Sequence, residues 1–211
     1  PDSAEFLAKL GVKRVLLASS SSVRETLGEV CTALGKSGIE VVDAPPIDRE
    51  PTCAMFEAVL QQARTEKVDG VLGIGGGSVI DVAKLVAALA RSRQSVKEVF
   101  GINLLHRRDL PLVCLPTTAG TGAEVSPNAI LLDESDALKK GVVSPHLVPD
   151  AAFVDPQLTM TVPPAVTAAT GLDALTHCIE AYANQFGPPH EAMSALEGIK
   201  LISANLVRAV R

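Results

Sequence analysis

The feature that most constrains the fold is a regular alternation of short apolar runs with segments of helical periodicity between residues 13 and 118. The apolar runs cover residues 13–18, 39–42, 68–74 and 110–115, and they are rich in Val, Leu and Ile. Between them, apolar residues recur every three or four positions, as on one face of an α-helix. Strands that alternate with helices in this way predict a parallel sheet with right-handed crossovers. The sequence therefore predicts an α/β fold.

Three helices are expected between these four strands. The first runs from Val23 through Leu34 and ends at Gly35 and Gly38, with Gly35 predicted to be its C-cap. The second begins after Thr52, whose side chain is suited to cap a helix. The third covers residues 78–91. Each helix would carry the chain from one strand of the sheet to the next.

The pattern changes after Pro164. Residues 164–183 and 189–210 are Ala-rich, have helical periodicity and lack any strand signal, and proline pairs stand where helices would start. We therefore predict an α/β dinucleotide-binding domain over 1–160 and the first helices of an all-helical domain over 161–211. About fifty residues in two or three helices barely form a core alone, so this second domain is expected to be incomplete here.

Composition excludes several classes of protein. The chain of 211 residues has 19 Lys and Arg against 24 Asp and Glu, a net charge of −5, so it lacks the basic face that nucleic acids require. A hydrophobic content of 47% argues against disorder. We see no signal peptide and no apolar run of about 18 residues, so no membrane segment is expected. Four widely spaced cysteines indicate reduced, buried thiols and a cytoplasmic protein.

A glycine-rich turn is the first segment that could carry chemistry. Gly75, Gly76, Gly77 and Ser78 follow a predicted strand and open a predicted helix. Glycines let the backbone approach a phosphate closely, and the helix N-terminus offers unpaired N–H groups with a positive dipole end. Ser78 could donate to phosphate or cap the helix. The alternative is a tight strand-to-helix turn without a ligand, but three consecutive glycines exceed what such a turn needs.

A second polar segment, residues 116–124, follows the strand at 110–115 and contains Thr117, Thr118 and Thr121. It lies at the carboxyl end of a strand, which is where ligands bind in open α/β sheets. Three hydroxyl groups on a glycine-containing loop suit contacts to a nucleotide. The alternative is an ordinary polar loop.

A third pair, Asp173 and His177, lies four residues apart on a predicted helix and so shares one face. A carboxylate and an imidazole at this spacing can chelate a divalent transition metal, although a surface pair has the same spacing. Two ligands leave a metal site incomplete. Cys178 is rotated about 100° from His177 and is expected to pack in the core. The other histidines are predicted to be surface residues of loops: His106, His146 and His190.

Taken together, four segments resemble the iron-containing (group III) alcohol dehydrogenases. They are GGGSVIDVAK at 75–84, LPTTAGTGAE at 115–124, PDAAFVDPQLTMTVPP at 149–164 and GLDALTHCIEAY at 171–182. The resemblance covers nearly the whole chain. It implies a nicotinamide-binding α/β domain, an all-helical metal-binding domain, and hydride transfer between NAD or NADP and an alcohol or aldehyde. It also implies a homodimer or larger homo-oligomer.

The resemblance assigns residues to the two cofactors. The pyrophosphate would be held at the glycine-rich turn with an aspartate close by, the threonines would line the cofactor, and a lysine would reach its ribose region, with Lys140 as the alternative. These assignments, together with a serine after the first strand, give the cofactor residues Ser20, Gly76, Gly77, Ser78, Asp81, Thr117, Thr118, Thr121 and Lys139.

The resemblance also makes Asp173 and His177 the first two ligands of a metal, iron(II) by resemblance and zinc as the alternative. The family completes this site with two further histidines in a segment that this sequence does not contain. The chain therefore resembles a fragment of a longer protein, and no general base is identifiable within it.

One departure concerns the cofactor. Many family members have an aspartate after the first strand, which binds the adenosine ribose and would repel a 2′-phosphate. Here Ser20 lies within a run of four serines, 19–22. The sequence therefore suggests that NADPH is tolerated or preferred.

Two alternatives remain open. Glycerol dehydrogenases, dehydroquinate synthases and maleylacetate reductases share this resemblance but have other chemistry. A truncated, non-catalytic dinucleotide-binding paralogue would explain the missing ligands, whereas the undamaged glycine, threonine and Asp-His segments argue for an enzyme.

Overall fold

The computed structural model describes the backbone of residues 1–211 and all side chains except those of Glu25 and Thr26. Its contacts divide the chain into two compact units. The first comprises Pro1–Pro116 and Ala123–Asp155, and the second Thr117–Gly122 and Pro156–Arg211. The sequence places a boundary near residue 160, and the assignment of the units as separate domains stays a prediction.

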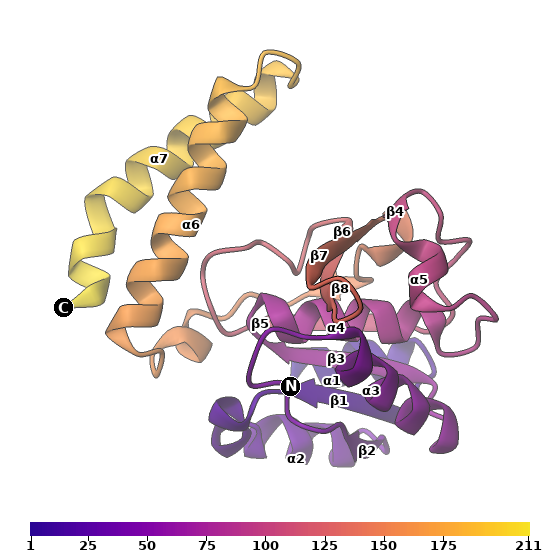
Figure 1. Ribbon diagram of the computed structural model, residues 1–211. Helices are drawn as coiled ribbons and strands as arrows, with labels where there is room; N and C mark the ends of the chain where they lie inside the picture. Colours follow the sequence, from indigo (N-terminus) through magenta and orange to yellow (C-terminus); the bar gives the residue numbers. More distant parts are fainter. The chain divides into compact units, whose positions relative to one another are not determined.

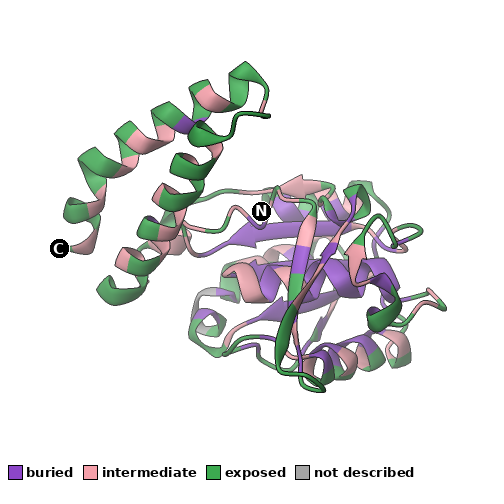
Figure 2. Ribbon diagram, turned by 45° about the horizontal axis from the view of Figure 1, so that its top comes forward, coloured by how far each residue is buried: buried purple, intermediate pink, exposed green. Residues whose placement is uncertain are grey.

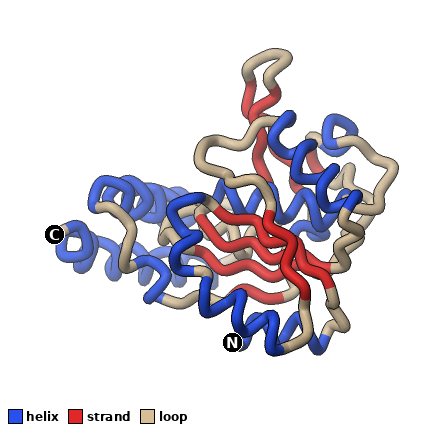
Figure 3. The backbone as a smooth tube through the Cα atoms, turned by 90° about the horizontal axis from the view of Figure 1, so that it is seen from below, coloured by secondary structure: helices blue, strands red, loops and turns tan.

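The first unit contains a five-stranded parallel sheet in the order β2-β1-β3-β5-β8 (Figures 1 and 3). This confirms the α/β fold that the alternating pattern predicts. Four strands lie within a few residues of the predicted runs, and only the short last one was not anticipated. The strands are β1 (Arg14–Ser19), β2 (Glu40–Asp43), β3 (Gly70–Gly75), β5 (Leu112–Pro116) and β8 (Ala151–Ala152).

The strand order places a topological switch point beside β1. After β1 the chain crosses to β2 on one side, and after β2 it returns to β3 on the other side of β1 (Figure 1). With right-handed crossovers, the two connecting helices leave on opposite faces of the sheet. Open α/β sheets bind ligands outside the carboxyl ends of the strands at such a point. The fold therefore directs attention to the segments that follow β1 and β3.

Three helices match the predicted ones in place, although the first begins at Gly28 and a 3-10 helix covers Ser21–Thr26 before it, and the helix Asp2–Lys9 was not anticipated. Thr52 caps α3 as predicted, because its Oγ1 accepts a hydrogen bond from the Met55 amide at 3.2 Å. Helices α3 and α4 pack against each other, and α1 packs against α2. Figure 2 shows α4 and the central strands as the most deeply buried elements. The helices of this part are α1 (Asp2–Lys9), the 3-10 helix η1 (Ser21–Thr26), α2 (Gly28–Lys36), α3 (Cys53–Thr65) and α4 (Gly77–Leu89).

The predicted end of α2 is wrong by a few residues. The helix continues through Gly35 to Lys36, and Ser37 is its C-cap. Gly38 is the residue that takes the left-handed backbone conformation, with φ of +72°. Glycine adopts this conformation without steric cost, so Gly38, just past the Ser37 C-cap, lets the chain turn away from the helix.

A second, smaller sheet was not anticipated. It has the order β4-β7-β6, in which β6 and β7 form an antiparallel hairpin. Asp133 is buried at the end of β6 and accepts from Lys140 at 2.7 Å and from Lys97 at 3.2 Å, which holds the pKa of this carboxyl well below its usual range. The elements here are α5 (Val96–Val99), β4 (Gly101–Ile102), β6 (Asn128–Asp133), β7 (Leu138–Val143) and the 3-10 helix η2 (Pro145–Leu147).

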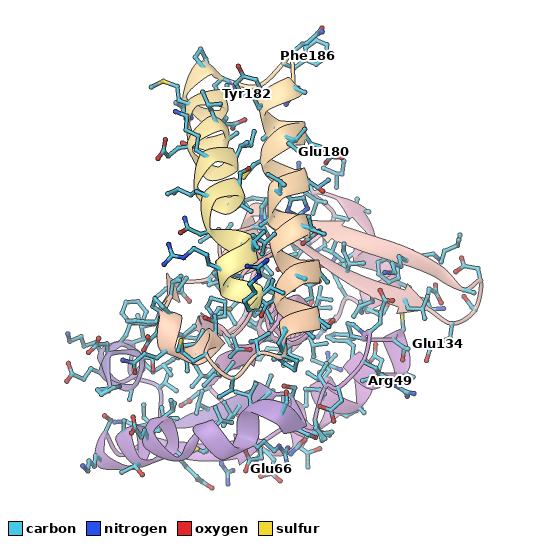
Figure 4. All side chains as sticks on the ribbon, turned by 90° about the vertical axis from the view of Figure 1, so that its left-hand side faces the viewer. Arg49, Glu66, Glu134, Glu180, Tyr182 and Phe186 are labelled. Carbon is cyan, nitrogen blue, oxygen red and sulfur yellow. The ribbon has the colours of Figure 1, made fainter. Side chains whose placement is uncertain are left out.

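The second unit contains the 3-10 helix η3 (Pro156–Thr159) and a helical hairpin of α6 (Pro164–Ala183) and α7 (Pro189–Val210). The predicted helices at 164–183 and 189–210 are confirmed. Two glycines let the helices approach closely: a Cβ at Gly171 would lie 2.2 Å from a Leu206 methyl group, and one at Gly198 would lie 2.6 Å from the Cys178 sulfur. At the turn, Phe186 is 97% exposed and projects from the hairpin (Figure 4).

No helix among the described residues is long and apolar enough to cross a membrane. All four cysteines are free. Cys53 and Cys114 are buried as predicted, and burial raises the pKa of the Cys114 thiol to about 12. Cys31 and Cys178 are only partly buried, so the prediction of buried thiols is correct for two of the four cysteines.

Candidate cofactor site and metal-binding residues

The turn from β3 into α4 requires glycine for packing. A Cβ at Gly73 would lie 2.8 Å from the Ala83 Cβ, and one at Gly75 would lie 2.6 Å from a Val79 methyl group. These glycines let α4 lie directly on β3. Close packing is thus a sufficient reason for glycine at positions 73 and 75.

The following residues form an open helix N-terminus. Gly76 is the N-cap of α4, and its carbonyl accepts from the amides of Val79 and Ile80 at 3.0 and 3.1 Å. The first amides of a helix have no acceptor within it, so those of Gly77 and Ser78 are available to a ligand. Gly76, Gly77 and Ser78 are half-buried, whereas Gly75 before them and Val79 after them are buried. Ser78 is the second residue of α4 and does not cap it. This arrangement suits an anion.

Asp81 lies one turn further along α4. Its carboxylate accepts a hydrogen bond from the Ile130 amide of β6 at 3.0 Å. Burial raises the pKa of Asp81 to about 6, while the Ile130 hydrogen bond and the nearby Lys84 charge oppose this rise. The structure therefore shows Asp81 linking the glycine-turn helix to the small sheet.

Lys84 was missed as a site residue by the sequence reasoning. It is fully buried, and its ammonium group donates to the Ser126 carbonyl at 2.7 Å, the Ser126 hydroxyl at 3.0 Å and the Asn128 carbonyl at 3.0 Å. Burial lowers the pKa of this amine. The signal in the sequence was a lone charge within the apolar segment VAKLVAAL. Lys84 fixes the start of β6 against α4.

The threonine segment follows β5. The last residues of the neighbouring strands β3 and β5, Gly75 and Pro116, are register partners. Thr117 is buried, Thr118 is half-buried and Thr121 is exposed. These three threonines belong to the second unit, where a Cβ on Gly120 would lie 2.9 Å from the Thr170 carbonyl oxygen of α6. Gly120 therefore allows the loop to pack directly on the α6 backbone.

The serine run after β1 has a partner that sequence reasoning missed. The Ser20 hydroxyl lies 3.0 Å from that of Ser22. Asp48, in the loop after β2, accepts from the Ser21 amide at 2.7 Å and from the Ser21 hydroxyl at 2.6 Å. No pattern marked Asp48, because it lies in a proline-rich loop 27 residues away.

The two candidate lysines on β7 have different surroundings. Lys139 pairs with Glu50 at 2.5 Å, and its side chain is 63% exposed. Lys140 pairs with both Asp133 and Asp136 at 2.7 Å, and its ammonium group lies 5.8 Å from the Phe100 ring centroid. Two carboxylates and an aromatic face hold Lys140 in place, so Lys139 is the better placed of the two to bind a ligand.

Asp173 and His177 lie one turn apart on α6. His177 Nε2 and Asp173 Oδ1 are 3.9 Å apart, and their side chains are 54% and 44% exposed. A carboxylate oxygen and an imidazole nitrogen at this spacing fit two positions of a transition-metal site. Among the side chains that the structure describes, no third His, Cys, Asp or Glu joins them. These two side chains could supply at most two ligands of such a site.

The other three histidines and Cys178 lie outside the candidate cofactor and metal residues. His106, His146 and His190 are exposed as predicted, although His146 lies in η2 and His190 in the first turn of α7, not in loops. Cys178 packs against Gly198 between the two helices of the hairpin.

Models of known protein families match nearly the whole chain. The profile of the iron-containing alcohol dehydrogenases matches residues 2–156, and the profile of the C-terminal region of that family matches residues 167–211. The chain belongs to the iron-containing alcohol dehydrogenase family.

Within this dehydrogenase family, similar proteins include long-chain-alcohol dehydrogenase 1 of Geobacillus thermodenitrificans, 39% identical over 96% of this chain and 52% of that protein. NAD-dependent methanol dehydrogenase of Bacillus methanolicus is 31% identical over 97% and 54%. A solved 1,3-propanediol oxidoreductase matches with a TM-score of 0.94 at 32% identity, over 98% of this chain and 55% of that one. The chain spans about half the length of the relatives that it matches.

Proposed function

We propose that this dehydrogenase-family chain belongs to a metal-dependent oxidoreductase that transfers a hydride between NAD(P) and an alcohol or aldehyde. The observation that supports this most strongly is the open helix N-terminus at Gly76, Gly77 and Ser78, at the carboxyl edge of a parallel sheet. A dinucleotide pyrophosphate is the ligand that such a turn suits best.

The roles of the chain's own residues follow from their positions. The amides of Gly77 and Ser78, aided by the Ser78 hydroxyl, would accept the pyrophosphate. Asp81 and Lys84 hold α4 to β6 and so keep this turn rigid. Lys139 and Ser20 would bind the ribose region, and Thr117, Thr118 and Thr121 would contact the cofactor along their loop.

Asp173 and His177 would hold iron(II), or zinc, with ligands beyond the two described here. Bound metal supplies Lewis acidity toward the substrate oxygen, and bound nicotinamide supplies the hydride acceptor or donor. The role of this chain is to position both groups, since no general base is identifiable among its residues.

The cofactor, the substrate, the oligomeric state and the location are proposed from relatives. One relative is an NAD-dependent methanol dehydrogenase, and a sulfoacetaldehyde reductase from Bifidobacterium kashiwanohense, with a TM-score of 0.88 at 28% identity, was solved in complex with NAD+. NAD is therefore proposed ahead of NADP, in contrast to the interpretation of Ser20 from sequence. A small alcohol or aldehyde substrate, a homo-oligomeric state and a cytoplasmic location are proposed from the family resemblance.

The first test is cofactor binding, with the fluorescence of NADH or NADPH as the readout because the chain contains no Trp. Gly77→Asp places a negative charge at the first position of α4, where it favours the helix but repels a pyrophosphate. We expect saturable binding by the wild type and at least a tenfold loss in this variant.

The matched control is Gly35→Asp. Gly35 lies in the last turn of α2, with no atom within 4 Å of an added Cβ, and this end of a crossover helix faces the amino edge of the sheet. The control is expected to bind like the wild type. If the wild type binds neither cofactor, or if Gly77→Asp binds normally, the proposed cofactor site is wrong.

A second candidate is a dinucleotide-binding protein without catalysis. The observation in its favour is that Asp173 and His177 have no further ligand among the described side chains. Cofactor binding without alcohol oxidation in the presence of iron(II) or zinc would support this candidate.

A further inference from the structure

The loop after β2 extends the sheet edge next to β1. The Ala44 amide donates to the Leu17 carbonyl, and the Ile47 amide donates to the Ser19 carbonyl, both at 3.0 Å. Residues 44–48 therefore follow β1 beyond the end of β2. This places Asp48 beside the serine run that leaves β1, at the side of the switch point opposite the glycine turn on β3.

Asp48 is a charged, accessible carboxylate at this position. It is exposed to solvent, and it accepts two hydrogen bonds from Ser21. These hydrogen bonds, which favour the ionised form, lower the pKa of Asp48. The hydrogen-bond donors that the serine run would offer to a phosphate are therefore partly occupied by the Asp48 carboxylate.

The surrounding cations do not cancel this charge. Arg24 donates to the Ala44 carbonyl at 2.8 Å and acts on Asp48 only through space. Lys139 is paired with Glu50. The remaining cation on this loop, Arg49, is exposed and follows Asp48 in the sequence. A 2′-phosphate in this region would thus meet an ionised carboxylate first.

A carboxylate near the end of the second strand suits an adenosine ribose. It can accept hydrogen bonds from the 2′- and 3′-hydroxyl groups, and it repels a 2′-phosphate. The serine run alone suggested the opposite preference. The difference lies in Asp48. The tertiary structure brings this carboxylate beside the serine run after β1, and the run itself contains no acidic residue.

We propose that Asp48 is the residue that selects NAD(H) over NADP(H) by binding the adenosine ribose hydroxyls. This inference rests on the proposed function, because it requires a dinucleotide at the switch point. It replaces Ser20 as the determinant of cofactor choice.

The experiment measures the dissociation constants of NADH and NADPH for the 211-residue chain and its variants. The wild type is expected to bind NADH at least tenfold more tightly than NADPH. Asp48→Asn removes the charge with little change in shape and is expected to reduce this ratio at least tenfold, through weaker NADH binding and tighter NADPH binding.

Two variants separate ribose recognition from a structural role. Ser21→Ala removes the hydroxyl that holds Asp48 but keeps the carboxylate, so the NADH preference should remain within about threefold of the wild type. Glu5→Gln makes the same change of net charge on an exposed position of α1 and should leave the ratio unchanged.

Several results would overturn the inference. A wild type that binds NADPH as tightly as NADH would contradict it, as would an unchanged ratio in Asp48→Asn. An equal shift in Ser21→Ala would make Asp48 a support for the serine turn only. In each of these cases cofactor binding itself persists, so the proposed function survives. Absence of binding by either cofactor would instead refute the proposed function, and the inference with it.

Discussion

At the scale of single residues, the most informative side chains are two charged ones on α4, of which Lys84 is fully buried and Asp81 is half-buried. Asp81 and Lys84 lie in the helix that begins at the glycine turn, and both bond to the backbone around β6. A buried polar group costs stability unless its hydrogen bonds are made. Their contacts therefore explain why a helix that is otherwise apolar carries two charges.

We expect Asp81 to make the free energy of unfolding depend on pH. Its pKa in the folded chain is about 6, above the ordinary value of about 4. Below about pH 4 this carboxyl is protonated in both the folded and the unfolded chain. As the pH rises from about 4 to 6, the unfolded chain ionises while the folded chain stays protonated, so stability is lost. Asp81→Asn can still accept from Ile130 and should avoid this loss. We expect the free energy of unfolding of the variant, relative to the wild type, to rise by about 2 kcal/mol between pH 4 and 7.5.

Urea unfolding followed by circular dichroism at several pH values measures this difference. Asp2→Asn, a change on the exposed first turn of α1, serves as the control and should show no such trend. Parallel stability curves for Asp81→Asn and the wild type would show that Asp81 is not buried as an ionisable group.

At the scale of elements, close contact between β3 and α4 sets the position of the glycine turn. The contact distance of 2.8 Å between a Cβ at Gly73 and the Ala83 Cβ leaves no room for a methyl group, and neither side can rotate away. By contrast, a Cβ at Gly35 on α2 would meet no atom within 4 Å. The same substitution thus tests two opposite environments.

We expect Gly73→Ala to lower the free energy of unfolding by about 1–3 kcal/mol, because the added methyl group forces α4 away from β3. Gly35→Ala should raise it by about 0.5–1 kcal/mol, because alanine favours the helix and nothing obstructs it. Urea unfolding of both variants gives the two values. Equal effects on the two variants would contradict this account of the packing.

At the scale of the whole molecule, the chain contains an α/β unit with a well-filled core and a helical hairpin whose side chains are mostly exposed or half-buried (Figure 2). Asp173 and His177 belong to the hairpin. A structural zinc site has four ligands and a catalytic one has three from the protein. The described pair should therefore bind metal weakly.

Metal retention tests this expectation. After loading with iron(II) or zinc and dialysis, the chain should hold well below one ion per molecule, because two donors on one helix cannot enclose the metal. His177→Ala should reduce the binding measured before dialysis at least tenfold, since it removes one of the two donors. An ion that stays bound in a one-to-one ratio would show that further ligands exist.

Much of the fold and part of the candidate site could be predicted from the sequence. The period of the apolar residues predicts strands and helices because it decides which face of each element is buried. The short hairpin of β6 and β7 was missed because its burial comes from contacts with distant elements, among them α3 and α4. The glycine turn and the Asp173–His177 pair were found because their members are neighbours in sequence or on one helix, although their roles stay proposals.

The sequence by itself determined the alternation of the four main strands with their helices, the helical hairpin and the glycines that open α4. The tertiary structure decided which distant groups meet: Asp48 with Ser21 across 27 residues, and Lys84 with Ser126 across 42. The physical reason is the distance along the chain over which each interaction acts. Backbone preferences and side-chain periodicity act within one element, whereas hydrogen bonds between elements depend on strand order, register and the path of each loop.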